Sequence, residues 1–138
     1  LFLGQKDYQQ CMVIDRLMQQ TGFKETVKLH ICPTLRETDG LAMSSRNRRL
    51  NESDRKKAAS IFRTLSYLKQ QLHTGSLDAL LQTASDQLEQ EGFRTDYLVV
   101  ADAATLQPVS TWDGSQKLVA LVATFLGGVR LIDNLPLN

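Results

Sequence analysis

The chain has 138 residues, of which 42% are hydrophobic and 22% charged, and its formal net charge is +1. This length suits about one ordinary domain, and the composition is that of a globular protein with a core rather than a disordered segment. So small a net charge excludes a global field that would draw the chain onto nucleic acid, and no apolar run approaches the ~20 residues of a membrane span.

The first predicted element is a helix over residues 7–20, because apolar residues recur there every three or four positions. These residues are Tyr8, Cys11, Ile14, Leu17 and Met18. Gly22 follows in the position that commonly ends a helix. The chain starts at Leu1, without an initiator Met, directly in structured-looking sequence. We therefore expect a piece of a longer protein.

A strand is predicted next, over residues 26–31. Val27, Leu29 and Ile31 alternate there with polar residues, which predicts one buried face. A loop is expected from residue 33 to residue 45. The two cysteines, Cys11 and Cys32, have no CxxC spacing and are expected to be buried, reduced thiols.

Two helices and three strands are predicted after this loop. Asn51 and Asp54 resemble a capping box that starts a helix running to residue 73, and Ser76 is a suitable N-cap for a second helix ending near residue 92. The remaining sequence contains three β-rich runs, "DYLVVADA", "KLVALVATF" and "VRLIDNL". The Gly-Gly pair at residues 127–128 separates the last two, so we predict a three-stranded antiparallel sheet.

Two short stretches carry residues suited to binding a nucleotide. In "GQKDYQQ" (residues 4–10), Gly4 permits close approach of a ligand, Lys6 is a mobile cation, and Asp7 and Gln10 project from neighbouring positions of the first helical turns. The alternative is an ordinary helix start, where a carboxylate such as Asp7 is favoured by the helix dipole. The residues alone leave both interpretations open.

The second stretch is "DGLAMSSRN" (residues 39–47), where a turn dipeptide precedes two hydroxyls and a guanidinium. Ser44, Ser45 and Arg46 could bind a phosphate group, or a serine could cap a short helical turn. Residues 36–57 contain seven bases and four acids, so an anion site is favoured there. Nucleic-acid binding is not expected, because the run "SRNRR" has no nearby aromatic residues on which bases could stack.

Taken in order, "GQKDYQQ" and "CPTLRETDGLAMSSRNRRL" closely resemble the two ligand motifs of the pantothenate synthetase (pantoate–β-alanine ligase) family. The later "DYL" and "RLIDN" strands resemble the C-terminal domain of that family. The resemblance implies an ATP-dependent, AMP-forming condensation of pantoate with β-alanine through a pantoyl-adenylate, with Mg²⁺ carried by ATP. It also implies a cytoplasmic homodimer that binds neither nucleic acid nor membrane.

The fold class implied is α/β. Residues 1–34 would be the last helix and strand of a Rossmann-like ATP- and pantoate-binding domain. Residues 35–138 would form an α+β lid domain, with two helices packed on a three-stranded antiparallel sheet and with the phosphate loop attached.

The resemblance also implies roles for individual residues. Lys6 would contact phosphate and Asp7 the ribose, Gln10 would hold pantoate, and Leu35 would meet adenine through its backbone. The implied ATP-binding set is Gly4, Gln5, Lys6, Asp7, Leu35, Met43, Ser44, Ser45 and Arg46. The members with an implied catalytic role are Lys6, Ser44, Ser45 and Arg46.

Three departures from the family pattern limit these expectations. Gln5 replaces the usual Glu, the turn "QTGFKET" makes the spacing about two residues longer, and the N-terminal HxGH-type motif has no counterpart. We therefore expect the chain alone to be inactive. The alternatives that stay open are a non-catalytic binding or assembly module and another adenylate-forming nucleotidyltransferase of the same superfamily.

Overall fold

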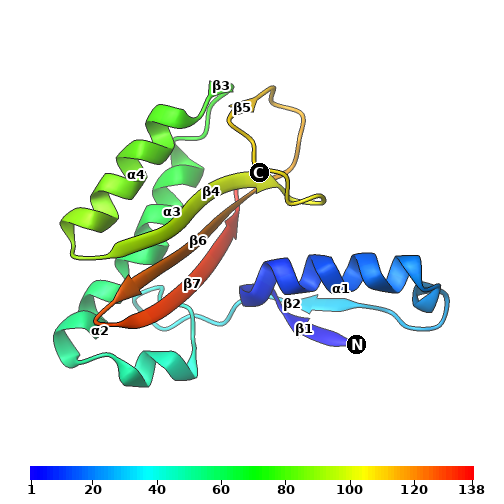
Figure 1. Ribbon diagram of the computed structural model, residues 1–138, viewed down its shortest axis with the longest axis horizontal. Helices are drawn as coiled ribbons and strands as arrows, with labels where there is room; N and C mark the ends of the chain where they lie inside the picture. The colour runs from blue at the N-terminus through cyan, green and yellow to red at the C-terminus, as the bar shows by residue number, and fades with distance from the viewer.

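The computed structural model describes residues 1–138 and shows a β-α-β segment that extends from one end of a larger unit of helices and sheet (Figure 1). The segment comprises β1 (Phe2–Gly4), the short 3-10 helix η1 (Gln5–Asp7), α1 (Tyr8–Gln20), η2 (Phe23–Glu25) and β2 (His30–Cys32). Strands β1 and β2 run parallel, with Leu3 opposite Ile31. Gly22 follows α1 in the left-handed conformation (φ 75°), as the sequence predicts.

The larger unit contains the predicted three-stranded antiparallel sheet, in the order β4-β6-β7. Its helices are η3 (Ser45–Arg49), α2 (Glu52–Ala58), α3 (Ser60–Gln70) and α4 (Asp78–Gln90), and its strands are β3 (Gly75–Ser76), β4 (Arg94–Asp102), β5 (Thr111–Trp112), β6 (Leu118–Leu126) and β7 (Val129–Pro136). Gly127 and Gly128 connect β6 to β7 with φ values of 55° and 75°. Two successive positive φ angles suit the tight two-residue hairpin that this register needs.

Helices α3 and α4 cover one face of this sheet and form the main core with it (Figure 1). Helix α3 contributes Ile61, Leu65 and Leu68, which lie on one side of the helix because they are three or four residues apart. Val122 of β6 and Leu131 of β7 meet them from the sheet. Because β6 is the central strand, eight of its nine residues are buried.

The opposite face of the sheet carries a smaller apolar cluster that meets the start of α1. Val119 and Leu121 of β6 are buried there, and Tyr8 packs against them. The Tyr8 hydroxyl donates a hydrogen bond to the carbonyl oxygen of Ala103 at 2.8 Å. Burial is the main cause of a raised pKa for Tyr8. This contact places the N-terminal end of α1, and the turn that precedes it, beside the sheet.

The structure corrects the predicted helix over residues 51–73. Asn51 caps it as predicted, since its Oδ1 accepts the amide of Asp54 at 2.8 Å. The helix is divided, however, into α2 and α3 at Ala59. Ala59 keeps right-handed angles with ψ −20°, so the chain tightens toward a 3-10 turn instead of unwinding.

The structure also corrects the predicted strand over residues 26–31, which is confined to His30–Cys32 and is not half-buried. Val27 and Ile31 are 37% and 38% exposed, and Leu17 of α1 is also exposed. Both cysteines are free thiols, but only Cys11 is buried. The reason is that β2 pairs only with β1, so no further layer of this chain covers that surface.

The short strands β1, β3 and β5 were not predicted from the sequence. Each is only two or three residues long, which is too short to show an alternating pattern. None of the helices combines the length and apolar character needed to cross a bilayer.

Candidate functional site

The turn between β1 and α1 carries the first candidate segment, residues 4–10. Gly4 ends β1, and the 3-10 helix η1 then leads into α1. Such a turn, at the carboxyl end of a strand and the amino end of a helix, directs backbone N–H groups and a positive dipole toward an anion. A side chain at Gly4 would meet no atom within 4 Å, so the backbone there has open space beside it.

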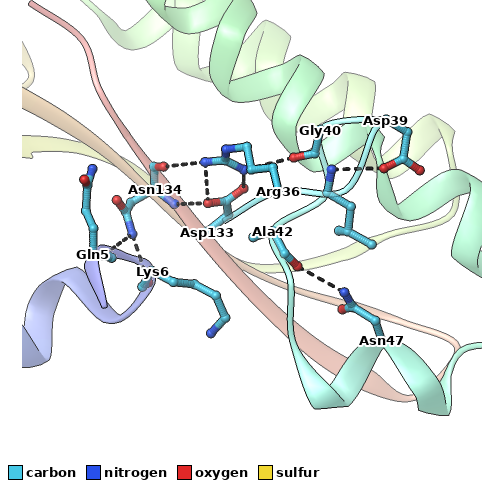
Figure 2. Close-up of polar contacts among 10 residues, drawn as sticks. Gln5, Lys6, Arg36, Asp39, Gly40, Ala42, Asn47, Asp133 and Asn134 are labelled. Carbon is cyan, nitrogen blue, oxygen red and sulfur yellow. Dashed lines mark hydrogen bonds and ion pairs between the residues drawn. The ribbon is translucent and has the colours of Figure 1, made fainter. Parts of the chain in front are cut away.

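Asn134 of β7 fixes the position of this turn. Its side-chain Nδ2 donates to the carbonyl oxygens of both Gln5 and Lys6, each at 2.9 Å (Figure 2). Asn134 is 2% exposed, so these bonds are shielded from water. Gln5 takes part in these bonds through its backbone carbonyl oxygen, so they do not depend on its side chain.

The second candidate segment, residues 36–47, is held on the same strand by Arg36. The Arg36 guanidinium donates to both carboxylate oxygens of Asp133, at 2.6 and 3.0 Å, and to the carbonyl oxygen of Gly40 at 3.0 Å (Figure 2). It also lies 4.1 Å from the centre of the Phe62 ring in a cation–π contact. The loop is therefore anchored to the sheet and to α3 by one side chain.

Gly40 is required at the tip of this loop. Its φ is +92°, which disfavours side chains, and an added Cβ would clash with the Phe62 ring at Cδ1. The Asp39 carboxylate accepts the amide of Leu41 at 3.1 Å and closes the turn. Asn47 then ties the far end of the loop back, donating to the carbonyl oxygen of Ala42 at 3.0 Å.

The two segments meet at one hollow. Lys6 from the first segment and Ser44 and Arg46 from the second line it together, with Asp133 at its wall. The Asp133 charge is already neutralised by Arg36, so the remaining charges that line the hollow are cationic. Arg46 takes part in none of the seven ion pairs of the chain. The hollow has a volume of only about 10 Å³, so an anionic group would lie at its mouth, where Lys6 and Arg46 of the two segments can contact it.

A neighbouring hollow extends from Lys6 along the start of α1. Asp7 and Gln10 line it, as do Tyr97 and Asn134 from the sheet. Asp7 makes no capping hydrogen bond, and its Oδ1 lies 3.7 Å from Nζ of Lys6. Asp7 thus does not serve as a side-chain cap, and both side chains at this turn have donor or acceptor capacity left for a ligand.

Other predicted residues lie further from the Lys6 hollow. Met43 and Ser45 line an adjoining, solvent-facing hollow, which shares Ser44 with the Lys6 hollow. Leu35 is 73% exposed. Ser44 does act as a cap, since its Oγ accepts the amide of Arg46 at 3.3 Å, but it also lines the hollow with Lys6. Capping and phosphate contact are therefore compatible at this serine.

Sequence reasoning missed the residues that assemble the site, which are Arg36, Asn47, Asp133 and Asn134. The sequence predicted only a strand for "RLIDN", and it gave Arg36 no role beyond being one of the seven bases of residues 36–57. Asp133 lies 97 residues from Arg36 in the chain, and no local pattern reports such a pairing. The one available signal was the polar pair Asp133-Asn134 within an otherwise apolar strand. A charge buried in such a strand needs a partner elsewhere in the chain.

Asp39 gives this loop a pH dependence. Arg55 donates to its carboxylate at 2.6 Å, and this bond, with the amide of Leu41, lowers the pKa of Asp39. A lowered folded-state pKa stabilises the fold at pH values above the unfolded pKa of about 3.9, and the contribution is lost as the pH falls further. The side chain is 38% exposed, so solvent screening limits the contribution to about 1 kcal/mol or less.

We therefore expect Asp39→Asn to lower the free energy of unfolding at pH 7 by at most about 1 kcal/mol. The amide still accepts the Leu41 N–H, so the substitution isolates the charge. Urea unfolding of wild type and variant at pH 7 and pH 3 measures the effect, and the difference should shrink at pH 3. An equal loss at both pH values would show that the charge of Asp39 is not what stabilises the loop.

Together these features define an α/β protein with a candidate anion-binding site between a β-α turn and a basic loop. The sequence model of the family described as Pantoate-beta-alanine ligase matches residues 1–136. The chain belongs to this family.

Curated relatives agree with the family match. Pantothenate synthetase of Pseudomonas fluorescens (strain Pf0-1) is 45% identical over 137 residues, which cover 98% of this chain and 46% of that protein. Pantothenate synthetase of Aeromonas hydrophila subsp. hydrophila is 41% identical over 133 residues, covering 95% of this chain and 45% of that protein. The chain thus spans about half the length of the curated relatives it matches.

Solved structures show the same fold. Pantothenate synthetase of Thermus thermophilus superposes with a TM-score of 0.85 at 38% identity, covering 99% of this chain and 49% of that one. Pantoate-beta-alanine ligase of Francisella tularensis, solved in complex with beta-gamma ATP and beta-alanine, gives a TM-score of 0.69 at 29% identity, over 99% of this chain and 42% of that one.

Proposed function

We propose that this chain is part of an ATP-dependent, AMP-forming ligase that joins pantoate to β-alanine, and that it supplies the phosphate side of the active site. The observation that carries the proposal is the shared hollow of Lys6, Ser44 and Arg46, which joins two segments far apart in the sequence. The Francisella tularensis relative, solved with beta-gamma ATP and beta-alanine, supports these ligands for the family.

In the proposed reaction, a carboxylate oxygen of pantoate attacks the α-phosphorus of ATP, and pyrophosphate leaves. The amine of β-alanine then attacks the acyl carbon of the pantoyl-adenylate, loses a proton, and displaces AMP. Lys6, Ser44 and Arg46 stabilise negative charge that grows on the leaving pyrophosphate, because fixed donors and cations act most strongly where charge develops.

The remaining residues bind and orient the substrates. Asp7 accepts hydrogen bonds from the ribose hydroxyls, and Gln10 holds a polar group of pantoate in the neighbouring hollow. Gly4 and Gln5 offer backbone groups to ATP. Leu35 meets adenine through its backbone, while Met43 and Ser45 approach the triphosphate when the loop closes over it.

Mg²⁺ enters with ATP in this proposal. Phosphate oxygens and water suit Mg²⁺ as ligands, so the ion needs few protein groups. The chain contains no group of three or more His, Cys, Asp and Glu side chains placed to hold a metal. Its role here would be to neutralise phosphate charge beside Lys6 and Arg46.

The domain organisation is proposed on the same basis. Residues 1–34 belong to a Rossmann-like ATP- and pantoate-binding domain, and residues 35–138 form a lid that carries the phosphate loop. The parallel β1-α1-β2 segment supports this boundary. We also propose that the full-length protein is a cytoplasmic homodimer, as the family resemblance implies.

The test is release of AMP and pyrophosphate from ATP by the full-length protein that contains these residues. Pyrophosphate release is expected only when pantoate is present, and release of AMP with formation of pantothenate only when β-alanine is added as well. Release of pyrophosphate with another hydroxy acid, but not with pantoate, would favour a different adenylate-forming enzyme. Absence of turnover with every acid would favour a binding or assembly module.

The 138-residue chain by itself is expected to show no turnover in this assay. Both substrates must be held in reacting geometry for the displacement to occur, and this chain supplies one side of that site. ATP binding without turnover fits the proposal. Pantothenate formation by the chain alone would refute this part of it.

A further inference from the structure

Strand β7 is the structural link between the two candidate ligand segments. It lies at the edge of the sheet, after β6. Asp133 is paired with Val122, which faces α3, and Asn134 is paired with Leu121, which faces α1. Successive residues of a strand point to opposite faces, so two neighbouring side chains reach the two segments from opposite sides of one strand.

The Asp133 side holds the loop of residues 36–47. Its side chain is 2% exposed and that of Arg36 is 18% exposed, so their two-point pairing is largely shielded from solvent. Arg36 additionally donates to the carbonyl oxygen of Asn134 at 3.3 Å. The loop is therefore bonded both to the side chain and to the backbone of this dipeptide (Figure 2).

The Asn134 side holds the turn of residues 4–7. Both protons of its amide are used, one on the carbonyl oxygen of Gln5 and one on that of Lys6. Its backbone N–H donates to Oδ1 of Asp133 at 2.8 Å. A continuous series of hydrogen bonds thus runs from the Lys6 backbone through Asn134 and Asp133 to Arg36.

At Asn134, the outer edge of β7 bonds to side chains and not to a further strand. The N–H and C=O groups of Asn134 bond to Asp133 and Arg36 side groups rather than to another strand. A regular strand is stiff, so the separation of the two segments is set by the backbone of β7 and not by either loop. Lys6 lines one hollow with Ser44 and Arg46, and its backbone carbonyl oxygen is held there by Asn134.

Resting on the proposed function, we propose that Asn134 is a positioning residue for the reaction, which sets the place of Lys6 relative to the phosphate loop. Both protons of its side-chain amide are used on backbone carbonyl oxygens of the protein. Its two amide donors fix the Lys6 backbone, and a displacement of about 1 Å in such a group can cost about 10²-fold in rate. Removal of the donors should therefore lower kcat even when the fold is retained.

The experiment uses the full-length protein with Asn134→Ser and Asn134→Ala, which remove the two-donor amide without burying a charge. Serine is the milder change, because its hydroxyl can still donate one bond. We expect kcat for AMP release to fall in the order wild type, serine, alanine, with alanine about 10- to 100-fold below wild type. The KM for β-alanine should change by less than about threefold, because a positioning fault at the phosphates acts on the transition state.

Val100→Ala is the matched control. Val100 of β4 is 1% exposed, lies in the main core on the face of the sheet that α3 and α4 cover, and lines neither hollow. Its truncation should lower Tm as much as the Asn134 variants do, while kcat stays within about twofold. An equal loss of kcat in Val100→Ala would reduce the role of Asn134 to general stability and overturn the proposal.

A double-mutant cycle separates positioning from independent effects. If Asn134 acts through Lys6, then Lys6→Ala with Asn134→Ala should be no slower than Lys6→Ala alone. The proposal would be overturned if the double variant lost the product of the two single-variant losses in kcat, or if Asn134→Ala kept the wild-type kcat. Either result would leave the proposed function intact. A wild-type protein that releases no AMP would instead overturn both.

Discussion

Replacement of Lys6 by alanine in the full-length protein is expected to lower kcat for AMP release by about 10²- to 10³-fold, which is the typical loss when one donor to a developing charge is removed. The side chain of Lys6 is 18% exposed and its only ion-pair partner is Asp7, at 3.7 Å. The turn thus holds its ammonium group at the hollow, where it makes no short ion pair within the protein and can still bind a ligand.

The fold should tolerate this change. Lys6 is anchored through its backbone carbonyl, which alanine retains, so Tm is expected to stay within a few degrees of wild type. The assay is the pantoate-dependent release of AMP at saturating ATP and β-alanine, measured over a range of pantoate concentrations to separate kcat from the KM for pantoate. A fall in kcat with little change in the KM for pantoate is the expected pattern.

Lys57→Ala is the matched control for charge. Lys57 is an exposed lysine of α2, belongs to the same basic stretch, and takes part in none of the chain's ion pairs. Loss of this charge should leave kcat unchanged, since it lines neither hollow. Similar losses in both variants would indicate a general electrostatic effect, and an unimpaired Lys6→Ala would remove Lys6 from the mechanism.

The second large effect is expected on stability, at the Arg36–Asp133 pair. Arg36→Ala leaves the Asp133 carboxylate buried without its counter-ion, which typically costs about 3–5 kcal/mol. It also removes the bonds to the carbonyl oxygens of Gly40 and Asn134. Urea unfolding of the 138-residue chain at pH 7 measures the loss.

Two comparisons sharpen this result. Lys24→Ala breaks the Asp15 pair, whose side chains are 42% and 37% exposed, and should cost about 1 kcal/mol or less. The double variant Arg36→Met with Asp133→Leu removes both charges, and it should be more stable than Arg36→Ala. If Arg36→Ala cost no more than Lys24→Ala, the pair would not be what anchors the loop.

The double variant also distinguishes stability from site assembly. Apolar replacements can restore packing at β7, but they cannot bond the carbonyl oxygen of Gly40. We therefore expect the loop carrying Ser44 to be displaced even where unfolding free energy recovers. This result would show that the ion pair is kept for the geometry of the loop, rather than for net stability.

Much of the fold was predictable because it depends on local patterns. The 3.6-residue spacing of Ile61, Leu65 and Leu68, the Asn51 cap and the Gly127-Gly128 turn each specify an element within a few residues. The alternation over residues 26–31 failed for a related reason. Alternation predicts that a strand has two unlike faces, but which face is buried depends on whether another layer covers it.

The candidate site divides in the same way between sequence and structure. The sequence by itself determined the chemistry of two segments, "GQKDYQQ" and "DGLAMSSRN", because donors, cations and turn-forming residues are properties of the residues in order. It also determined their family resemblance. It left open whether either segment was more than a helix start or a cap.

Only the tertiary structure decided that Lys6 shares a hollow with Ser44 and Arg46, and that Met43, Ser45 and Leu35 lie outside it. Asp133 and Asn134 join these segments across 97 and 128 residues of chain. The physical reason is that adjacent side chains on a strand point in opposite directions. Which segments they meet there is set by the packing of β7 between α3 and the start of α1, and no local pattern records it.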